Sequence, residues 1–188
     1  MESGSPALSI TAGERVRLRQ ARLDDAAFLR RLMNAPGWLR YIGDRQIRTH
    51  EDARAYIQNS LISSYRTHGF GLYVVEHSEE AIGLCGLLQR DYLDAPDLGF
   101  AILPEYERQG LTREAIELTL EYAAQSLQLR ELLAIVLEEN LPSQKLLRRC
   151  GFKPSGTVDS DKGDELLLYR QTLVCRSEEA RSQLQRDQ

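Results

Sequence analysis

A strand-length apolar run that ends at a proline and leads into an amphipathic helix restricts the fold of this chain more than any other feature. It lies in the stretch LGFAILPEYERQGLTREA at residues 98–115. Phe100, Ile102 and Leu103 are the apolar strand residues. Pro104 lacks a backbone N–H, so the strand must end there or peel away from its neighbour. The apolar positions of the next segment recur at helical spacing: Leu111, Ala115, Leu118 and Tyr122. The pattern predicts a strand with a gap beside it, followed by a turn and a helix.

The turn before this helix has the features of an anion-binding site. The first N–H groups of a helix have no partner within it and, together with the helix dipole, they favour a phosphate group. Gly110 lets the backbone come close to such a ligand, and Arg108 and Arg113 add positive charge. The turn therefore predicts a phosphate site, and an ordinary strand, turn and helix with solvated arginines is the alternative interpretation.

A second segment, ELLAIVLEENLPSQKLLRRCGF at residues 131–152, has the same strand-to-helix form. Its apolar run is continuous, which indicates a strand that is buried on both faces. Asn140 stands where that strand ends, and Pro142 suits the first turn of a helix. Gly151 stops this helix before Phe152.

Together the two segments resemble the GNAT superfamily of acetyl-coenzyme A (acetyl-CoA) dependent N-acetyltransferases, in the branch that includes the ribosomal-protein N-terminal acetyltransferases. Four further segments resemble that branch in order and spacing: ERVRLRQARLDDAAFLRRLMN, THEDARAYI, GFGLYVVEHSEEAIGLCGL and GDELLLYRQTL. The resemblance extends from about Arg15 to Leu173. It implies one α/β (α+β) domain whose mixed, mostly antiparallel sheet is flanked by helices and splayed at the fourth and fifth strands, where acetyl-CoA lies.

The coenzyme loop departs from the family pattern of Gln or Arg, two variable residues, Gly, one variable residue, then Gly or Ala. Those positions are Glu107, Gly110 and Thr112, and Arg108 stands where a further glycine is frequent. A glutamate near a pyrophosphate repels it unless its side chain points outward, but backbone N–H groups do not depend on side-chain identity. The resemblance thus implies that coenzyme contacts come from Phe100, Ile102, Arg108, Gln109, Gly110, Leu111, Thr112, Arg113, Asn140 and Ser143.

Acetyl transfer requires a neutral amine, a group that polarises the thioester carbonyl, and protonation of the departing thiolate. An α-amine with a pKa near 8 is roughly a tenth neutral at pH 7, whereas a lysine amine is almost wholly charged. Asp97 stands at the start of the strand beside the coenzyme, where this branch commonly has an acidic residue, and is the first candidate for the base. The alternative is a solvated carboxylate at a strand end. Asp91 and Asp94 are weaker candidates.

The acid is less obvious. Many GNAT enzymes place a tyrosine seven residues after the asparagine, and that position is Leu147 here. Branch members can use a serine three residues after the asparagine, which implies Ser143, although a polar residue in a first helical turn has the same pattern. For Asn140, the resemblance implies a hydrogen bond to the pantetheine chain, and the alternative is a helix N-terminal residue.

The amine acceptor is expected near Trp38, Tyr41 and Tyr92, with Ile42 and Tyr65 close by. Aromatic and acidic groups suit an amine through cation–π or ionic contact, while simple burial in the core is the alternative. The sequence leaves a protein N-terminus, a polyamine, an amino acid and an aminoglycoside open as acceptors.

Composition excludes several function classes. The 188-residue chain has a formal net charge of −4 and no basic block, so no nucleic-acid partner is expected. No apolar run is of membrane-spanning length and no secretory segment is evident, which predicts a cytoplasmic protein without a membrane partner. Cys85, Cys150 and Cys175 fit neither a disulfide framework nor a zinc site, so no metal is expected. Residues 1–13 are expected to be frayed, residues 14–174 to form the domain and residues 175–188 to form a charged tail.

These observations predict an N-acetyltransferase that moves an acetyl group from acetyl-CoA directly to a primary amine, either a protein N-terminus or a small molecule. A monomer or a homodimer is expected. The alternative is a non-catalytic or weakly active coenzyme A binding module of the same fold, which Glu107, Thr112 and Leu147 favour. A purely structural domain is a third possibility.

Overall fold

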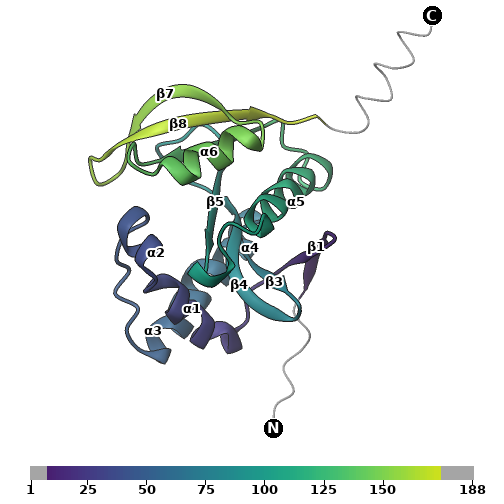
Figure 1. Cartoon of the computed structure of the whole chain (residues 1–188), viewed down its shortest axis with the longest axis vertical. Coiled ribbons are helices and arrows are strands. Elements are labelled where there is room, and N and C mark those ends of the chain that lie inside the picture. Colours follow the sequence, from purple (N-terminus) through teal and green to yellow (C-terminus); the bar gives the residue numbers. More distant parts are fainter. Residues whose placement is uncertain (1–7, 175–188) are drawn as a thin grey trace, which may run out of the picture. The chain divides into compact units, whose positions relative to one another are not determined.

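The computed structural model describes residues 8–174, which form two compact units (Figure 1). The described part of unit 1 comprises residues 8–88 and 99–118, and that of unit 2 comprises residues 89–98 and 119–174. Strand β5 (Asp97–Ile102) and helix α5 (Leu111–Gln125) each contribute residues to both units.

Unit 1 contains an antiparallel sheet with the strand order β1-β2-β3-β4, followed by the larger part of β5. The other strands are β1 (Ser9–Ala12), β2 (Val16–Arg19), β3 (Leu72–His77) and β4 (Glu80–Leu88). The helices are α1 (Ala26–Met33), α2 (Pro36–Tyr41), α3 (His50–Tyr56) and α4 (Ser63–His68). A π-helical segment, Ile57–Ile62, joins α3 to α4, and short 3₁₀ turns occupy Leu23–Asp25 and Pro104–Tyr106.

Local sequence explains several of these boundaries. The Thr49 side chain accepts a hydrogen bond from the Asp52 N–H, and the Asp52 side chain accepts one from the Thr49 N–H, so the two residues form a capping box at the start of α3. Ser78 and Glu79 both have positive φ, at 49° and 67°, as a tight turn between β3 and β4 requires. The segment HSEE is thus the turn of a β-hairpin made by β3 and β4.

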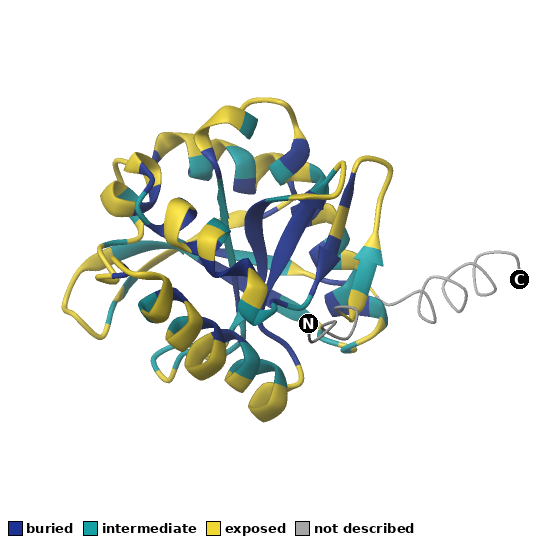
Figure 2. Cartoon of the chain, turned by 90° about the horizontal axis from the view of Figure 1, so that it is seen from below, coloured by how far each residue is buried: buried dark blue, intermediate teal, exposed yellow. Residues whose placement is uncertain are grey.

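The core of unit 1 lies between its helices and one face of its sheet. Its buried members are Ala21, Ala26, Leu29, Leu32, Met33, Trp38, Ile47, Ala53, Ile57, Leu61, Leu72, Val74, Leu84 and Leu103. The helices carry exposed residues on their outer sides, as amphipathic segments do (Figure 2).

A buried ionic cluster also lies in unit 1. Arg19 donates to both carboxylate oxygens of Asp25, at 2.8 and 2.7 Å, and its Nε donates to Glu76. All three side chains are at most 8% exposed. Burial raises the pKa of Glu76, but hydrogen bonds from Arg19 and Arg17 outweigh it and leave that pKa below its usual value. The sequence analysis did not predict this cluster.

Unit 2 contains β6 (Glu131–Val136), β7 (Lys153–Asp159), β8 (Glu165–Thr172) and helix α6 (Leu141–Arg149). Its strand order is β5-β6-β8-β7, in which β6 and β7 both pair antiparallel with β8, and α6 packs on β6 (Figure 1). The strands β5 and β6 pair in parallel through Asp97 and Leu133.

The fold class is therefore confirmed as α/β, with a mostly antiparallel sheet that contains one parallel pair. That pair, β5 with β6, corresponds to the expected fourth and fifth strands. It joins at the N-terminal end of β5, while residues 99–102 belong to unit 1. Strand β1 was not predicted, because residues 1–13 were expected to be frayed.

The expectations for the cysteines, for the C-terminal tail and for membrane-spanning segments can be compared only with the described residues. Cys85 and Cys150 are both buried, whereas Cys175 and the predicted tail at 175–188 lie outside the described residues. Among the helices of residues 8–174, none is long and apolar enough to cross a membrane.

Candidate active site

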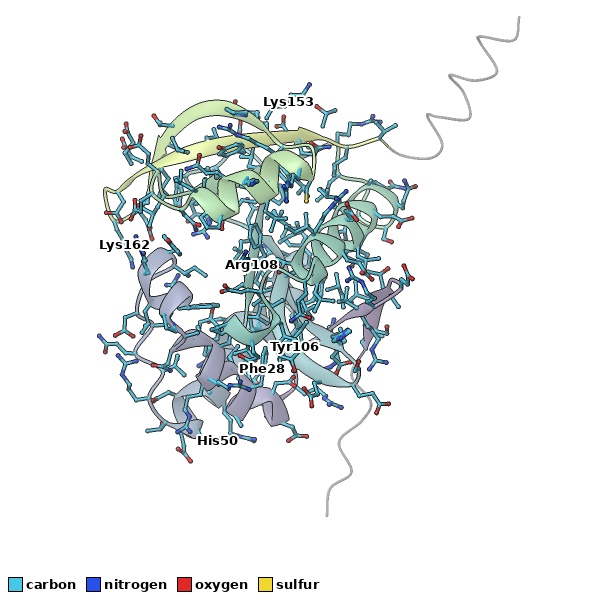
Figure 3. All side chains as sticks on the ribbon, viewed as in Figure 1. Phe28, His50, Tyr106, Arg108, Lys153 and Lys162 are labelled. Atoms are coloured by element: carbon cyan, nitrogen blue, oxygen red, sulfur yellow. The ribbon has the colours of Figure 1, made fainter. Side chains whose placement is uncertain are left out.

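The predicted phosphate turn has a left-handed backbone at two of its residues. After the 3₁₀ turn, Arg108 and Gly110 both adopt positive φ, at 62° and 80°. The Glu114 N–H donates to the Gly110 carbonyl at 3.1 Å, so the N–H groups of residues 111–113 precede the hydrogen-bond ladder of α5. Figure 3 shows Arg108 at this turn. The geometry is that of an anion site made by a helix N-terminus.

The side chains of the turn differ in what they contact. Leu111 is 2% exposed and anchors the helix in the core, so only its backbone is available to a ligand. Gln109 donates to the Glu105 carbonyl at 2.9 Å, and Arg113 pairs with Glu117 at 2.7 Å. Arg108 is exposed and Thr112 is half-buried.

Glu107 was expected to repel a pyrophosphate unless it points outward. Its side chain is exposed, and its Oε1 lies 4.0 Å from the place where a Cβ on Gly37 would be. The carboxylate therefore lies near the start of α2. On β5, Phe100 and Ile102 are half-buried at alternate positions and so share one face of the strand.

In unit 2, Asn140 has the role that the sequence offered as the alternative. Its Oδ1 accepts a hydrogen bond from the Ser143 N–H at 3.2 Å, which makes Asn140 the N-cap of α6. Within residues 8–174, the Asn140 amide donates no hydrogen bond, and neither does the Ser143 hydroxyl. Both groups are thus available to a ligand.

The position expected for a tyrosine acid, Leu147, is 1% exposed and packs in the interior. A polar network that the sequence analysis missed lies on the same helix. Gln144 donates to the Glu138 carbonyl at 2.6 Å and accepts from the Tyr169 hydroxyl at 3.2 Å. This network ties α6 to β8.

Asp97 is not the solvated carboxylate that was considered as the alternative. It is 1% exposed, and Arg90 Nε donates to both of its carboxylate oxygens, at 3.0 and 3.1 Å. Burial raises the pKa of Asp97 to about 6, against the opposing effect of the Arg90 charge and hydrogen bond. A carboxylate with such a pKa is suited to proton transfer near neutral pH.

Arg90 also contacts Tyr92, and the sequence analysis missed Arg90 altogether. Arg90 Nη1 donates to the Tyr92 hydroxyl at 3.2 Å, and the guanidinium carbon lies 6.0 Å from the centre of the Tyr92 ring. The signal in the sequence is an arginine seven residues before Asp97, in the loop that leads into β5. Asp97, Arg90 and Tyr92 thus form one cluster in unit 2.

The other two acids of this loop are exposed. Arg170 donates to Asp94 at 3.0 Å, and that hydrogen bond lowers the pKa of Asp94. Asp94 is therefore a poor proton acceptor at neutral pH, and Asp91 faces solvent.

The predicted acceptor residues divide into two groups. Trp38 is 6% exposed in the core of unit 1, and Tyr65 is inside, stacked on Tyr73 with its hydroxyl bonded to the Leu72 carbonyl. For these two residues, burial in the core, which was the alternative to contact with the acceptor, is what the structure has. Tyr41 is half-buried, and the Arg40 guanidinium lies 5.0 Å from the centre of its ring.

The structure therefore gathers the candidate residues in two sets. The phosphate turn, Trp38 and Tyr41 belong to unit 1, whereas Asp97, Tyr92, Asn140 and Ser143 belong to unit 2. Among residues 8–174, no group of three or more His, Cys, Asp or Glu side chains is arranged to hold a metal ion.

Comparison with known proteins gives the family and the fold of the chain. A family model described as an acetyltransferase (GNAT) domain matches residues 15–153, a range that includes the phosphate turn, Asp97 and Asn140. The N-acetyltransferase p20 of Bacillus licheniformis is 28% identical over 169 residues, which cover 87% of this chain and 94% of p20. The spermidine N(1)-acetyltransferase of Escherichia coli K12 is 27% identical over 146 residues, 76% of this chain and 75% of that enzyme.

Among solved structures, the ribosomal L7/L12 α-N-protein acetyltransferase RimL in complex with coenzyme A superposes with a TM-score of 0.76. The match covers 88% of this chain and 98% of RimL at 18% sequence identity. At this identity the comparison shows a shared fold.

Proposed function

The chain belongs to the GNAT acetyltransferase family, and from this premise we propose that it transfers the acetyl group of acetyl-CoA directly to a primary amine. The observation that carries the proposal is the phosphate turn at Arg108–Arg113, where Gly110 and three leading N–H groups of α5 form an anion site. A pyrophosphate needs such donors and tolerates the side-chain departures at Glu107 and Thr112, because the donors are backbone groups.

The proposed reaction is a single displacement. The amine nitrogen attacks the thioester carbonyl, the new C–N bond forms and the C–S bond breaks. The nitrogen loses one proton and the departing thiolate gains one. Acetyl-CoA supplies the activated acyl group, and the chain supplies groups that hold it and move the two protons.

Asp97 is the proposed base. With a pKa of about 6 it is ionised in roughly nine molecules of ten at pH 7, yet it still binds a proton far better than an exposed aspartate. Burial and the hydrogen bonds from Arg90 hold this carboxylate in place, and we propose that the amine transfers its proton to it directly or through one water. Tyr92, on the same cluster, is proposed to contact the acceptor.

Ser143 is the proposed proton donor to the thiolate, and Asn140 the proposed donor to the pantetheine chain. The support is that the Ser143 hydroxyl and the Asn140 amide engage no partner in the described part of the chain, while Asn140 Oδ1 is occupied by the helix cap. Capping and coenzyme contact therefore use different atoms of the same asparagine.

The acceptor is proposed to be a protein N-terminus or a small amine. The spermidine N(1)-acetyltransferase and the ribosomal L7/L12 α-N-protein acetyltransferase are named for one of each class. At pH 7 an α-amine is neutral more often than a lysine amine, so it needs less help from a base. The cytoplasmic location and the monomeric or homodimeric state stay predictions.

An acceptor screen tests this function. The purified chain is incubated with acetyl-CoA and a panel of N-terminal peptides, polyamines, amino acids and aminoglycosides, and the products are read by mass spectrometry for one added acetyl group. We expect transfer to at least one class, with loss of transfer in the Gly110→Asp variant. A panel without acetylated products would contradict the proposal.

A coenzyme-binding module without efficient transfer is the second candidate. It is favoured by the buried leucine at position 147, where many family members carry the acid. The two candidates differ in thiol release, because only the enzyme liberates coenzyme A faster with an amine present. A coenzyme-dependent thermal shift without thiol release would favour the module.

A further inference from the structure

The side chain of Arg15, the residue before β2, reaches the phosphate turn, and it contacts residues there that are more than ninety positions away in the sequence. Its Nε donates to Glu114 Oε2 at 2.9 Å, and its Nη1 donates to the Gln109 carbonyl at 3.0 Å. Glu114 Oε1 in turn accepts the backbone N–H groups of Arg15, at 2.7 Å, and Val16, at 3.1 Å. The turn and the first turn of α5 are thus fastened to β2 at four points.

The guanidinium also lies over Gly110. Arg15 Nη2 is 3.3 Å from the place where a Cβ on Gly110 would be, and Nη2 donates no hydrogen bond among residues 8–174. Arg108 holds a left-handed backbone that costs a non-glycine residue free energy. Surrounding contacts must therefore hold the turn in this conformation, and those of Arg15 act on the adjacent carbonyl.

Charge gives Arg15 a second effect. Burial raises the pKa of Glu114, but hydrogen bonds from Arg15 and Val16 outweigh it, so the pKa is lowered and Glu114 is ionised. An ionised carboxylate in the first turn of α5 repels an incoming phosphate. The Arg15 charge beside it compensates for that repulsion.

We infer that Arg15 is a positioning residue for coenzyme binding, which holds the Gln109–Gly110 turn open to the pyrophosphate and neutralises Glu114 next to it. This inference rests on the proposed function, since it requires acetyl-CoA to bind at the turn. It also accounts for a turn without the second glycine of the family pattern, because a residue from another strand supports the backbone and supplies positive charge.

The test is the dissociation constant of acetyl-CoA, measured by calorimetry for the whole chain. Arg15→Ala is expected to raise it about tenfold, as loss of charge-assisted contacts does. The double variant Arg15→Ala/Glu114→Gln is expected to bind more tightly than Arg15→Ala alone, because the uncompensated carboxylate is gone. Arg15→Lys, which keeps the charge without the planar fork, should fall between Arg15→Ala and the wild type.

Arg17→Ala is the matched control. Arg17 lies two residues after Arg15, in β2, is 51% exposed and pairs with Glu76 away from the turn, so its loss should leave the dissociation constant unchanged. The melting temperature of each variant without coenzyme shows whether it folds, and Arg15→Lys carries the test if Arg15→Ala does not.

A merely structural role predicts a different pattern, in which Glu114→Gln recovers no affinity in the Arg15→Ala background. That result, or a wild-type dissociation constant in a folded Arg15→Ala protein, overturns the inference alone. A wild-type chain that does not bind acetyl-CoA overturns the proposed function together with it.

Discussion

Arg90 binds both carboxylate oxygens of Asp97 through one nitrogen, at 3.0 and 3.1 Å, where the aspartate is 1% exposed. The pair sets two opposing influences on one proton: burial favours the neutral acid, and the arginine favours the carboxylate. The outcome is a pKa of about 6, which lies close to neutral pH.

The first prediction concerns activity and pH. If Asp97 is the base, kcat/KM calculated for the neutral form of the amine should fall about tenfold for each unit that the pH drops below about 6, because the protonated acid cannot accept a proton. Asp97→Asn should lower kcat by a factor of roughly 10² to 10⁴ and remove this limb. Initial rates from pH 5 to 8 measure both effects.

The Arg90→Gln variant tests whether Arg90 lowers the pKa of Asp97. Without the guanidinium charge the pKa of Asp97 should rise, so the acid limb should move to higher pH. Arg170→Gln is the control, because it removes an exposed pair with Asp94 in the same unit. A limb that stays in place in Arg90→Gln would show that another group titrates.

The second prediction concerns stability. The pKa of Asp97 is higher in the folded chain than its usual value, so the folded state binds more protons between about pH 4 and 6. The free energy of unfolding of the wild type, relative to Asp97→Asn, should therefore fall as the pH rises through this window, by about 2 kcal/mol between pH 4.5 and 7. Urea titrations of both proteins at pH 4.5 and 7 give the difference. A wild-type advantage that grows with pH would contradict the assigned shift.

The third prediction concerns Gly110. An aspartate tolerates the left-handed backbone, and its side chain would extend toward Arg15, so Gly110→Asp should fold at a cost of about 1 kcal/mol. It places negative charge where the phosphates bind, and should abolish the coenzyme-dependent thermal shift. The wild type should be stabilised by about 2.7 kcal/mol at a hundred times the dissociation constant. Gly163→Asp, with a φ of 83° and nothing within 4 Å, is the control that should keep the shift.

The fourth prediction concerns Ser143. Its backbone N–H holds the helix cap, and its hydroxyl has no partner in residues 8–174, so Ser143→Ala should change stability by less than about 0.5 kcal/mol. If the hydroxyl protonates the thiolate, kcat should fall at least about tenfold while the coenzyme dissociation constant stays constant. Steady-state kinetics and calorimetry separate the two quantities. An unchanged kcat would leave water or the acceptor as the proton source.

The fifth prediction separates the two roles of Asn140. Asn140→Ala removes the cap and should cost about 1 kcal/mol of stability, whereas Asn140→Ser keeps a capping oxygen and should cost much less. Both variants lack the amide N–H groups, so both should raise the KM for acetyl-CoA. If only Asn140→Ala raised it, the asparagine would serve the helix alone.

Much of this fold could be predicted because its signals are local. The Thr49–Asp52 box, the proline at the start of α6 and the turn before α5 depend on residues a few positions apart. The burial of Asp97 and Trp38 could not be predicted, because it depends on which segments pack above them. Likewise, no local pattern connects Arg15 with Gln109, or Arg19 with Glu76.

The ionic cluster of Arg19, Asp25 and Glu76 has a consequence for how this chain can diverge. Losing the arginine alone leaves Asp25 buried without its ion-pair partner and leaves Glu76 paired with Arg17 alone, and breaking a buried pair in this way typically costs about 3–5 kcal/mol. Losing one carboxylate leaves Arg19 buried with only one of its two ion-pair partners. The three positions are therefore expected to change together in proteins that descend from this sequence. In each such protein they should be either all ionic or all apolar, and a replacement at one of them should be accompanied by a replacement at another.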